Sequence, residues 1–157
     1  MTNEAQRRVK ARAIMGARKQ GGIWKAPAKK DPVLLSPFDK EVYNSIEGKE
    51  HMFLREGEGT YYTIINSGKK VGIVGFANGK KNPFLTIGII KKFRGKGILP
   101  KAYGALARRH GLRKAYVDIE NTNKKSLEAH RAFGFKPTTE KADKKLYKTD
   151  VRMSKEF

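Results

Sequence analysis

A junction between a strand and a helix stands out in the sequence: residues 87–97 read IGIIKKFRGKG. Its first half is apolar and β-branched, as expected of a buried strand. Its second half places the basic side chains of Arg94 and Lys96 beside two glycines, Gly95 and Gly97. Glycines allow a tight turn that brings successive amide N–H groups close to a ligand. Because the dipole of the following helix favours an anion, the junction is suited to binding a pyrophosphate.

The segment at residues 94–97, which we call the glycine loop, matches neither of two common nucleotide-binding motifs. It lacks the Gly-Lys-Ser/Thr ending of a Walker loop. It also lacks the third glycine of a dinucleotide-binding fingerprint, and the strand before it follows a hairpin rather than opening a βαβ unit. Glycine-rich loops end strands for geometric reasons as well, so the loop alone leaves a purely structural role open.

The segments around the loop predict a mixed α/β sheet, with the order hairpin, strand, helix, strand, helix, strand. Period-two and β-branched runs predict strands at 33–35, 60–66, 71–78, 85–91 and 115–120, and a last strand or hairpin within 145–155. Period-3.6 runs predict one or two short helices within 38–53, a helix from the glycine loop to Gly111, and a helix at 123–133 that ends at Gly134.

Composition excludes several classes of function. A chain of 157 residues, 38% hydrophobic, is long enough for one core. With no cysteine and three scattered histidines, the sequence offers no disulfide, no thiolate zinc site and a poor metal cluster. No run reaches the roughly 18 apolar residues of a membrane span, and the start lacks the apolar stretch of a secretory signal. We therefore expect a soluble, cytoplasmic protein without metal catalysis.

The charge is strongly positive and uneven along the chain. Lysine and arginine number 35 against 15 acidic residues, a formal net charge of +20, which concentrates anionic partners. Nine of the basic residues precede residue 31, so we expect a basic extension at 1–32 and a globular domain at 33–157. The extension is either a solvated tail, one terminal helix packed on the domain, or an arm that binds nucleic acid.

Two blocks of sequence resemble the GNAT family of acyltransferases. The glycine loop is similar to the family's pyrophosphate-binding motif, Gln/Arg-x-x-Gly-x-Gly/Ala. Further on, Asn123, Ser126, His130, Gly134 and Phe135 fall at the spacing of Asn-x-x-Ala/Ser-x-x-x-Tyr/His-x-x-x-Gly-Phe. The two blocks are correctly separated, and the resemblance covers about two thirds of the chain, from residue 61 to 153.

The resemblance implies a fold and a cofactor site. The fold is a GNAT-like mixed, mostly antiparallel sheet flanked by helices, in which a splayed pair of parallel strands holds acetyl-CoA. By the resemblance, the backbone of Ile87 and Ile89 pairs with the pantetheine arm, and Asn123 orients that arm beside Ser126. The pyrophosphate is held by the amides of the glycine loop and of the next two residues, namely those of Arg94, Gly95, Lys96, Gly97, Ile98 and Leu99.

The loop departs from the family pattern at one position. When the motif starts at Arg94, Leu99 stands where the family has glycine or alanine, which would crowd the helix against the phosphates. In the alternative phasing, from Lys92, Gly95 and Gly97 are the two glycines.

The resemblance also implies an acid and a base. His130 stands where many relatives have the tyrosine that protonates the leaving CoA sulfur, and a histidine titrates near neutral pH. The alternative is a helix histidine that only packs. Several relatives have a carboxylate five residues before the asparagine, here Asp118, which would accept the proton of the amine through a water. Its alternatives are a strand residue without function, or Glu120 as the base.

The leading hypothesis is thus an N-acetyltransferase. It moves an acetyl group from acetyl-CoA to an amine acceptor by direct attack, without a covalent enzyme intermediate. The acceptor is a small molecule or a macromolecule, and the charge favours one that is anionic or associated with nucleic acid. The second hypothesis keeps the fold and drops catalysis: a basic nucleic-acid-binding or structural, virion-type protein.

Overall fold

The computed structural model describes residues 33–157 except 53, 55–56, 78–81 and 143. The described residues belong to one unit, Val33–Phe157. The predicted basic extension at 1–32 lies outside the described residues, so its helix and its binding role stay predictions. No helix of the described part is long and apolar enough to span a membrane.

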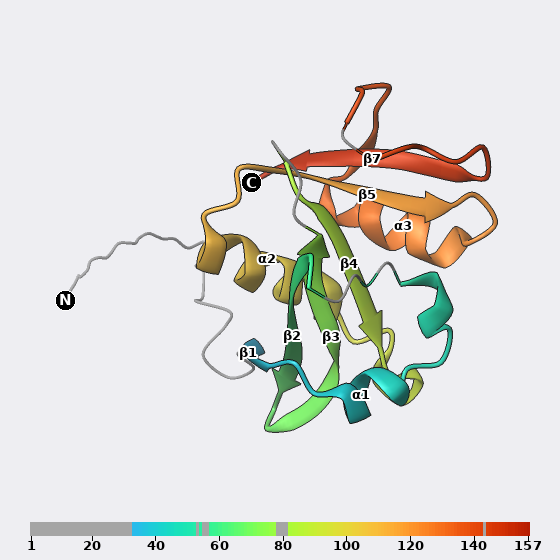
Figure 1. The fold of residues 1–157 in the computed structure, drawn as a ribbon. Coiled ribbons are helices and arrows are strands. Elements are labelled where there is room, and N and C mark those ends of the chain that lie inside the picture. Colours follow the sequence, from blue (N-terminus) through green and yellow to red (C-terminus); the bar gives the residue numbers. More distant parts are fainter. Residues whose placement is uncertain (1–32, 53, 55–56, 78–81, 143) are drawn as a thin grey trace, which may run out of the picture. The chain divides into compact units, whose positions relative to one another are not determined.

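A seven-stranded sheet organises the unit, in the order β1-β2-β3-β4-β5-β7-β6. All neighbouring strands are antiparallel except β4 and β5, which are parallel. Figure 1 shows these two strands running apart toward their carboxyl ends. The strands are β1 Val33–Pro37, β2 Gly59–Asn66, β3 Lys69–Ala77, β4 Phe84–Ile89, β5 Lys114–Glu120, β6 Lys136–Pro137 and β7 Asp150–Glu156.

Three α-helices and two 3-10 turns connect the strands. They are α1 Lys40–Asn44, η1 Lys49–His51, η2 Lys91–Phe93, α2 Ile98–His110 and α3 Lys124–Phe133. Side-chain oxygens of Asp39 and Asn123 cap the N-termini of α1 and α3. Gly111 and Gly134 end α2 and α3 in the left-handed conformation, as the sequence predicts.

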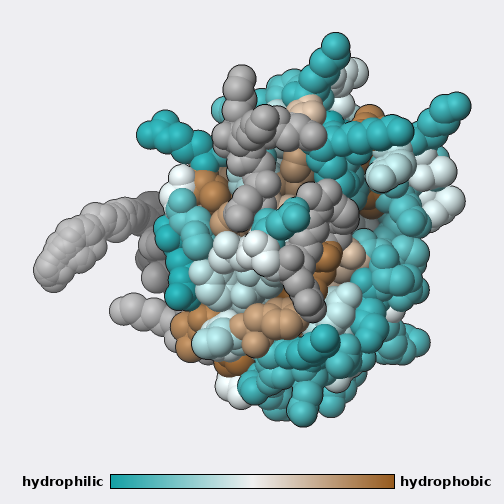
Figure 2. Space-filling view, viewed as in Figure 1, coloured by the Kyte–Doolittle hydropathy of each residue, from teal (hydrophilic) through white to brown (hydrophobic). Residues whose placement is uncertain are grey.

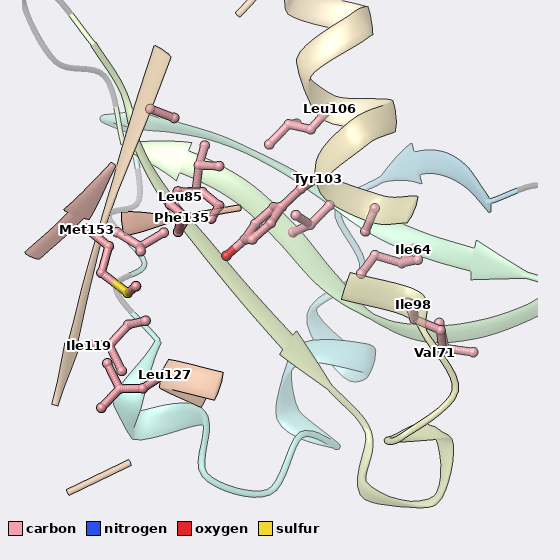
Figure 3. Close-up of a cluster of buried hydrophobic side chains, with 14 residues drawn as sticks. Ile64, Val71, Leu85, Ile98, Tyr103, Leu106, Ile119, Leu127, Phe135 and Met153 are labelled. Carbon is pink, nitrogen blue, oxygen red and sulfur yellow. The ribbon is translucent and has the colours of Figure 1, made fainter. Parts of the chain in front are cut away.

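The helices cover opposite faces of the sheet. The buried residues of α2 and α3, including Tyr103 and Leu127, pack with Ile64, Val71 and Leu85 in the main core. Figure 3 shows Tyr103 reaching from α2 across this cluster toward Phe135. On the other face, Val42 and Ile46 of α1 and the turn after it pack on Ile73 in a smaller cluster. The alternation of Ile73 and Val74 between the two clusters is the pleat of β3.

The predicted order of elements is confirmed, and the differences are at the ends. The strand predicted at 85–91 stops at Ile89, because residues 91–93 turn into a 3-10 helix. The last strand begins at Asp150, well inside the predicted 145–155. A two-residue strand, β6, pairs with β7 and carries too short a pattern to be read from the sequence.

Candidate active site

The site lies where β4 and β5 separate. They share one paired position, Phe84 beside Tyr116, with an amide bond from Tyr116 to the Pro83 carbonyl (2.9 Å). The rings of Phe84 and Tyr116 stack with centroids 5.2 Å apart and close the narrow end. Beyond this point, β4 keeps its bonds to β3 and β5 keeps its bonds to β7, so the two strands no longer bond each other. A gap lined by strand backbone results.

The backbone of β4 presents polar groups to this gap. The Ile90 amide donates to the Val71 carbonyl of β3 at 2.8 Å. In an antiparallel pair, hydrogen-bonded residues alternate along the strand, so Ile87 and Ile89 turn their N–H and C=O groups away from β3. Both therefore face the gap. The Ile89 carbonyl already accepts from Arg94 at 2.8 Å, so the groups offered to an extended amide-bearing arm are the N–H and C=O of Ile87 and the N–H of Ile89. This arrangement fits the predicted role of Ile87 and Ile89.

The glycine loop follows directly and is open on its outer side. Gly95 and Gly97 have φ of +75° and +72°, which side-chain-bearing residues rarely adopt. A Cβ placed on either would meet no heavy atom of the described residues within 4 Å. The loop thus has its shape for backbone reasons and leaves room above its amides. Arg94, Lys96 and Gly97 are exposed, as a phosphate-binding segment requires.

The first turn of α2 supplies two further donors. Ile98 is buried in the core and Leu99 packs against it. Leu99 is only partly buried, so the crowding expected from its place in the motif stays a prediction. The third residue of the turn, Pro100, has no N–H. The amides of Ile98 and Leu99 are those the helix N-terminus can offer to an anion.

The side chain of Arg94 bonds to protein backbone. Its Nε donates to the Ile89 carbonyl at 2.8 Å, and its terminal nitrogen donates to the Glu47 carbonyl. Arg94 thus ties the end of β4 to the segment after α1. A shallow pocket of about 530 Å³ lies beside this tie, lined by Glu47, Ile90, Lys91 and Lys92. The two lysines supply the positive side-chain charge among these lining residues, and Glu47 supplies a negative one.

The second sequence block forms one connected group on α3. Asn123 caps the helix, its Oδ1 accepting from the Ser126 amide at 3.2 Å. His130, 4% exposed, contacts the Ser126 carbonyl through Nδ1 (2.7 Å) and the Tyr103 hydroxyl through Nε2 (3.0 Å). A carbonyl only accepts, so we assign the ring proton to Nδ1 and the hydroxyl as donor to Nε2. Asn123 at this helix end is exposed, as a contact with the cofactor arm requires.

His130 is thus held as a neutral, fully bonded ring. Burial lowers its pKa, and the bond to Ser126 offsets this only in part. Burial also raises the pKa of Tyr103 far above its usual value, so its hydroxyl keeps its proton. Both nitrogens of His130 are occupied, and protonating the CoA sulfur would require this group to rearrange. The role of His130 as an acid stays a prediction. The observed geometry is that of a packed ring with a partner at each nitrogen.

Removing the Tyr103 hydroxyl tests how tightly this group is held. Tyr103→Phe is expected to lower the free energy of unfolding by about 1–2 kcal/mol, because Nε2 of buried His130 loses its donor. Urea denaturation measures the change. Tyr147→Phe is the matched control, since Tyr147 is 58% exposed and its hydroxyl can bond water. Equal stability of Tyr103→Phe and the wild type would show that the 3.0 Å contact contributes nothing.

Asp118 is the centre of a buried ion-pair network. Arg152 donates to both its carboxylate oxygens, at 2.8 and 2.9 Å, and Lys144 donates to one at 3.0 Å. Its side chain is 3% exposed. Burial raises the pKa of this carboxyl, but the bonds from Arg152 and Lys144 outweigh it, and the net direction is down. The role of Asp118 as the base stays a prediction. The bonds from Arg152 and Lys144 make its carboxylate a weaker base.

A pair that sequence spacing does not single out lies at the wide end of the gap. Nδ1 of His51, in η1, is 3.5 Å from Oε1 of Glu120, the last residue of β5. Both side chains are about half exposed. The two residues are 69 positions apart, and only the packing of η1 on the sheet brings them together. No periodic pattern in the sequence could have joined them.

The chain belongs to the acetyltransferase (GNAT) family, whose sequence profile matches residues 27–135. Membership places the chain among the acetyltransferases. No curated protein matches the sequence.

Solved structures share the fold. An acetyltransferase from Thermus thermophilus has a TM-score of 0.62 and 15% identity, covering 80% of this chain and 97% of that one. Campylobacter jejuni N-acetyltransferase PseH, in complex with acetyl coenzyme A, has a TM-score of 0.53 and 12% identity, covering 64% and 70%.

A Salmonella typhimurium acetyl transferase that modifies the N-terminal serine of 50S ribosomal subunit protein L7/L12 has a TM-score of 0.52 and 22% identity. The likeness covers 64% of this chain and 65% of that one, so it spans less than two thirds of that enzyme's length. At these identities the likeness concerns the fold alone.

Proposed function

We propose that this chain acetylates an amine on a macromolecule associated with nucleic acid, by direct attack of the amine on acetyl-CoA held between β4 and β5. The observation that carries the proposal is the gap itself: strand backbone of Ile87 and Ile89 faces it, and an open loop with left-handed glycines stands at its mouth. The strand backbone can bond the amide groups of the pantetheine arm, and the loop amides can bond the pyrophosphate.

Acyl transfer of this kind makes three demands on the protein. The amine must be neutral when it attacks, a proton must leave it, and the departing thiolate must be stabilised. We propose that the β4–β5 gap aligns the thioester, which supplies the effective concentration that direct attack requires. His130 is the proposed source of stabilisation for the thiolate, which requires its bonds to Tyr103 and Ser126 to rearrange when acetyl-CoA binds. Asn123 and Ser126, at the start of α3, are the proposed contacts of the cofactor arm.

The proposed class of acceptor rests on charge. A net charge of +20 repels small polycations and concentrates anionic macromolecules at the surface. Figure 2 shows hydrophilic residues over most of the periphery of the α1 face, around a smaller hydrophobic area. An amine on a protein bound to RNA or DNA combines a nucleophile with the anionic surroundings that this charge favours. The basic extension at 1–32 would add to this attraction.

Acetyl-CoA is expected to stabilise the protein against heat. At about 100 times its dissociation constant it adds about 2.7 kcal/mol to the free energy of unfolding. For a chain of this size the melting temperature rises by roughly 5–10 °C. Differential scanning fluorimetry measures the shift, and release of CoA with an amine panel measures turnover. The panel contains RNA-binding proteins, their N-terminal peptides, lysine peptides and spermidine.

Two results would contradict the proposed function. Absence of a thermal shift with acetyl-CoA would remove the binding site on which it depends. A shift without CoA release from any amine, together with tight, salt-sensitive binding to RNA or DNA, would support the non-catalytic basic protein instead. Faster acetylation of spermidine than of the RNA-binding proteins would keep the enzyme and overturn the acceptor class.

A further inference from the structure

A short segment crosses the β4–β5 gap on the face opposite α2 and α3. We call residues 46–52 the strap. Its Ile46 and Met52 lie directly on Gly88 of β4, so closely that a Cβ at Gly88 would collide with Met52. Its Glu47 carbonyl accepts from Arg94. At its other side, His51 reaches Glu120 of β5. The strap is therefore held on both strands that form the gap.

The face under the strap is set by the pleat of the two strands. Leu85, Ile87 and Ile89 pack in the main core with α2 and α3, so Gly88 lies on the α1 side. On β5, Val117 and Ile119 face the main core, so Asp118 and Glu120 lie on the α1 side too. His130 is on the opposite face, in the core. The strap thus lies on the face of the sheet opposite the helix that carries His130.

Two carboxylates of β5 share this side, and their surroundings differ. Asp118 is buried with both oxygens bonded to cations. Glu120, two residues on, is 49% exposed and points at an imidazole. Among the described residues, the acidic groups near His51 are Glu120 from β5, Glu50 of η1, whose Oε2 is 3.7 Å from Nε2, and Asp150, which pairs with Glu120 across β5 and β7.

We propose that His51 is the group that takes the proton from the acceptor amine, with Glu120 as its positioning residue. The inference rests on the proposed function. Glu120 fixes the ring through Nδ1, which leaves Nε2 as the basic atom. The amine nitrogen bonds to the thioester carbonyl carbon, and the C–S bond breaks with its electron pair leaving on the CoA sulfur. Before this attack, Nε2 removes a proton from the ammonium form of the acceptor and passes it to solvent. The second proton of the nitrogen goes to the CoA sulfur as the C–S bond breaks.

The geometry suits this role better than that of Asp118. The His51 side chain is half exposed and within reach of an acceptor, whereas the Asp118 carboxylate is buried and gives up its bonds to two cations when it is protonated. The 3.5 Å between His51 and Glu120 is slightly longer than a good hydrogen bond, as is common before substrate binds. The contacts of Ile46 and Met52 with Gly88, and of the Glu47 carbonyl with Arg94, hold the segment that carries His51 against β4.

The test compares two nucleophiles with different needs for a base. His51→Gln is expected to lower kcat/KM about 100-fold with an alkylamine peptide acceptor, because general-base catalysis of this kind contributes about 10²–10⁴-fold. With hydroxylamine, which is neutral at about pH 7 and needs no prior deprotonation, the loss is expected to stay below about threefold. Glu120→Gln is expected to lower the alkylamine rate about tenfold and to displace the acidic limb of its pH–rate profile.

The controls separate this inference from the proposed function. Glu156→Gln changes an exposed carboxylate at the end of β7, outside the proposed site, and is expected to keep kcat/KM within about threefold. Acetyl-CoA should stabilise all three variants as it does the wild type, which verifies folding and donor binding. In His51→Ala, added imidazole should restore part of the rate.

The outcomes are distinguishable. If the wild type is active, and His51→Gln acetylates the alkylamine equally fast with an unchanged pH profile, the proposed role of His51 is overturned. Equal losses with alkylamine and hydroxylamine, without rescue by imidazole, would show that the strap only shapes the site, and this too would overturn it. A wild type that neither binds acetyl-CoA nor releases CoA would contradict the proposed function.

Discussion

Replacing Gly97 by valine is expected to abolish stabilisation by acetyl-CoA and to lower kcat/KM for acetyl-CoA at least about 100-fold. Gly97 has a left-handed φ of +72° and open space where a side chain would project. A valine there either fills the space above the amides that we propose bind the pyrophosphate, or forces the loop into another shape. Each displaces several charge-assisted bonds at once, and two such bonds account for a loss of about 100-fold.

The matched control is Gly68→Val, in the turn between β2 and β3. Gly68 has φ of +76° and is equally open, so both variants carry the same kind of backbone strain, about 1–2 kcal/mol. Only Gly97→Val should lose the thermal shift and turnover. Isothermal titration with CoA measures affinity in both. Normal CoA affinity in a folded Gly97→Val protein would mean that the pyrophosphate lies elsewhere.

Replacing Asp118 by asparagine is expected to lower the free energy of unfolding by about 3–5 kcal/mol. The substitution keeps the shape of the side chain and leaves Arg152, whose side chain is 4% exposed, as an uncompensated buried charge. Urea denaturation at neutral pH measures the loss. Arg152→Met in the same background should recover part of it, because it removes the stranded cation. No recovery in the double variant would contradict this explanation.

The same carboxyl predicts a dependence of stability on pH. Its pKa is lower in the folded protein than in the unfolded chain, so its contribution is fully present above about pH 4 and is lost as the pH falls through the folded pKa. Wild type should therefore approach the stability of Asp118→Asn in acid. Glu140→Gln is the control at a more exposed carboxylate, which is 46% exposed and accepts from Lys114 and the Tyr116 hydroxyl, and it should shift the denaturation midpoint less than Asp118→Asn does. A constant difference between wild type and Asp118→Asn from neutral pH to about pH 2 would contradict the ion-pair explanation.

The sequence predicted the elements well because local patterns dictate them. Gly111 and Gly134 end their helices, and Val117 alternates with Asp118 between two faces of β5. The glycine loop could be recognised because a tight backbone turn requires glycine at particular places, Gly95 and Gly97. The roles proposed for His130 and Asp118 came from motif spacing. Spacing identifies a position in a fold and carries no information about burial, ion pairs or ring nitrogens.

The sequence by itself determined the order of strands and helices, the glycine loop, the excess of positive charge and the family resemblance. Only the tertiary structure decided which polar groups meet. It placed Arg152 and Lys144 on Asp118, Tyr103 on His130, and His51 on Glu120. The reason is physical: hydrogen bonding along the backbone and hydrophobic periodicity are local in the chain, whereas protonation and ion pairing depend on neighbours that packing brings from distant segments.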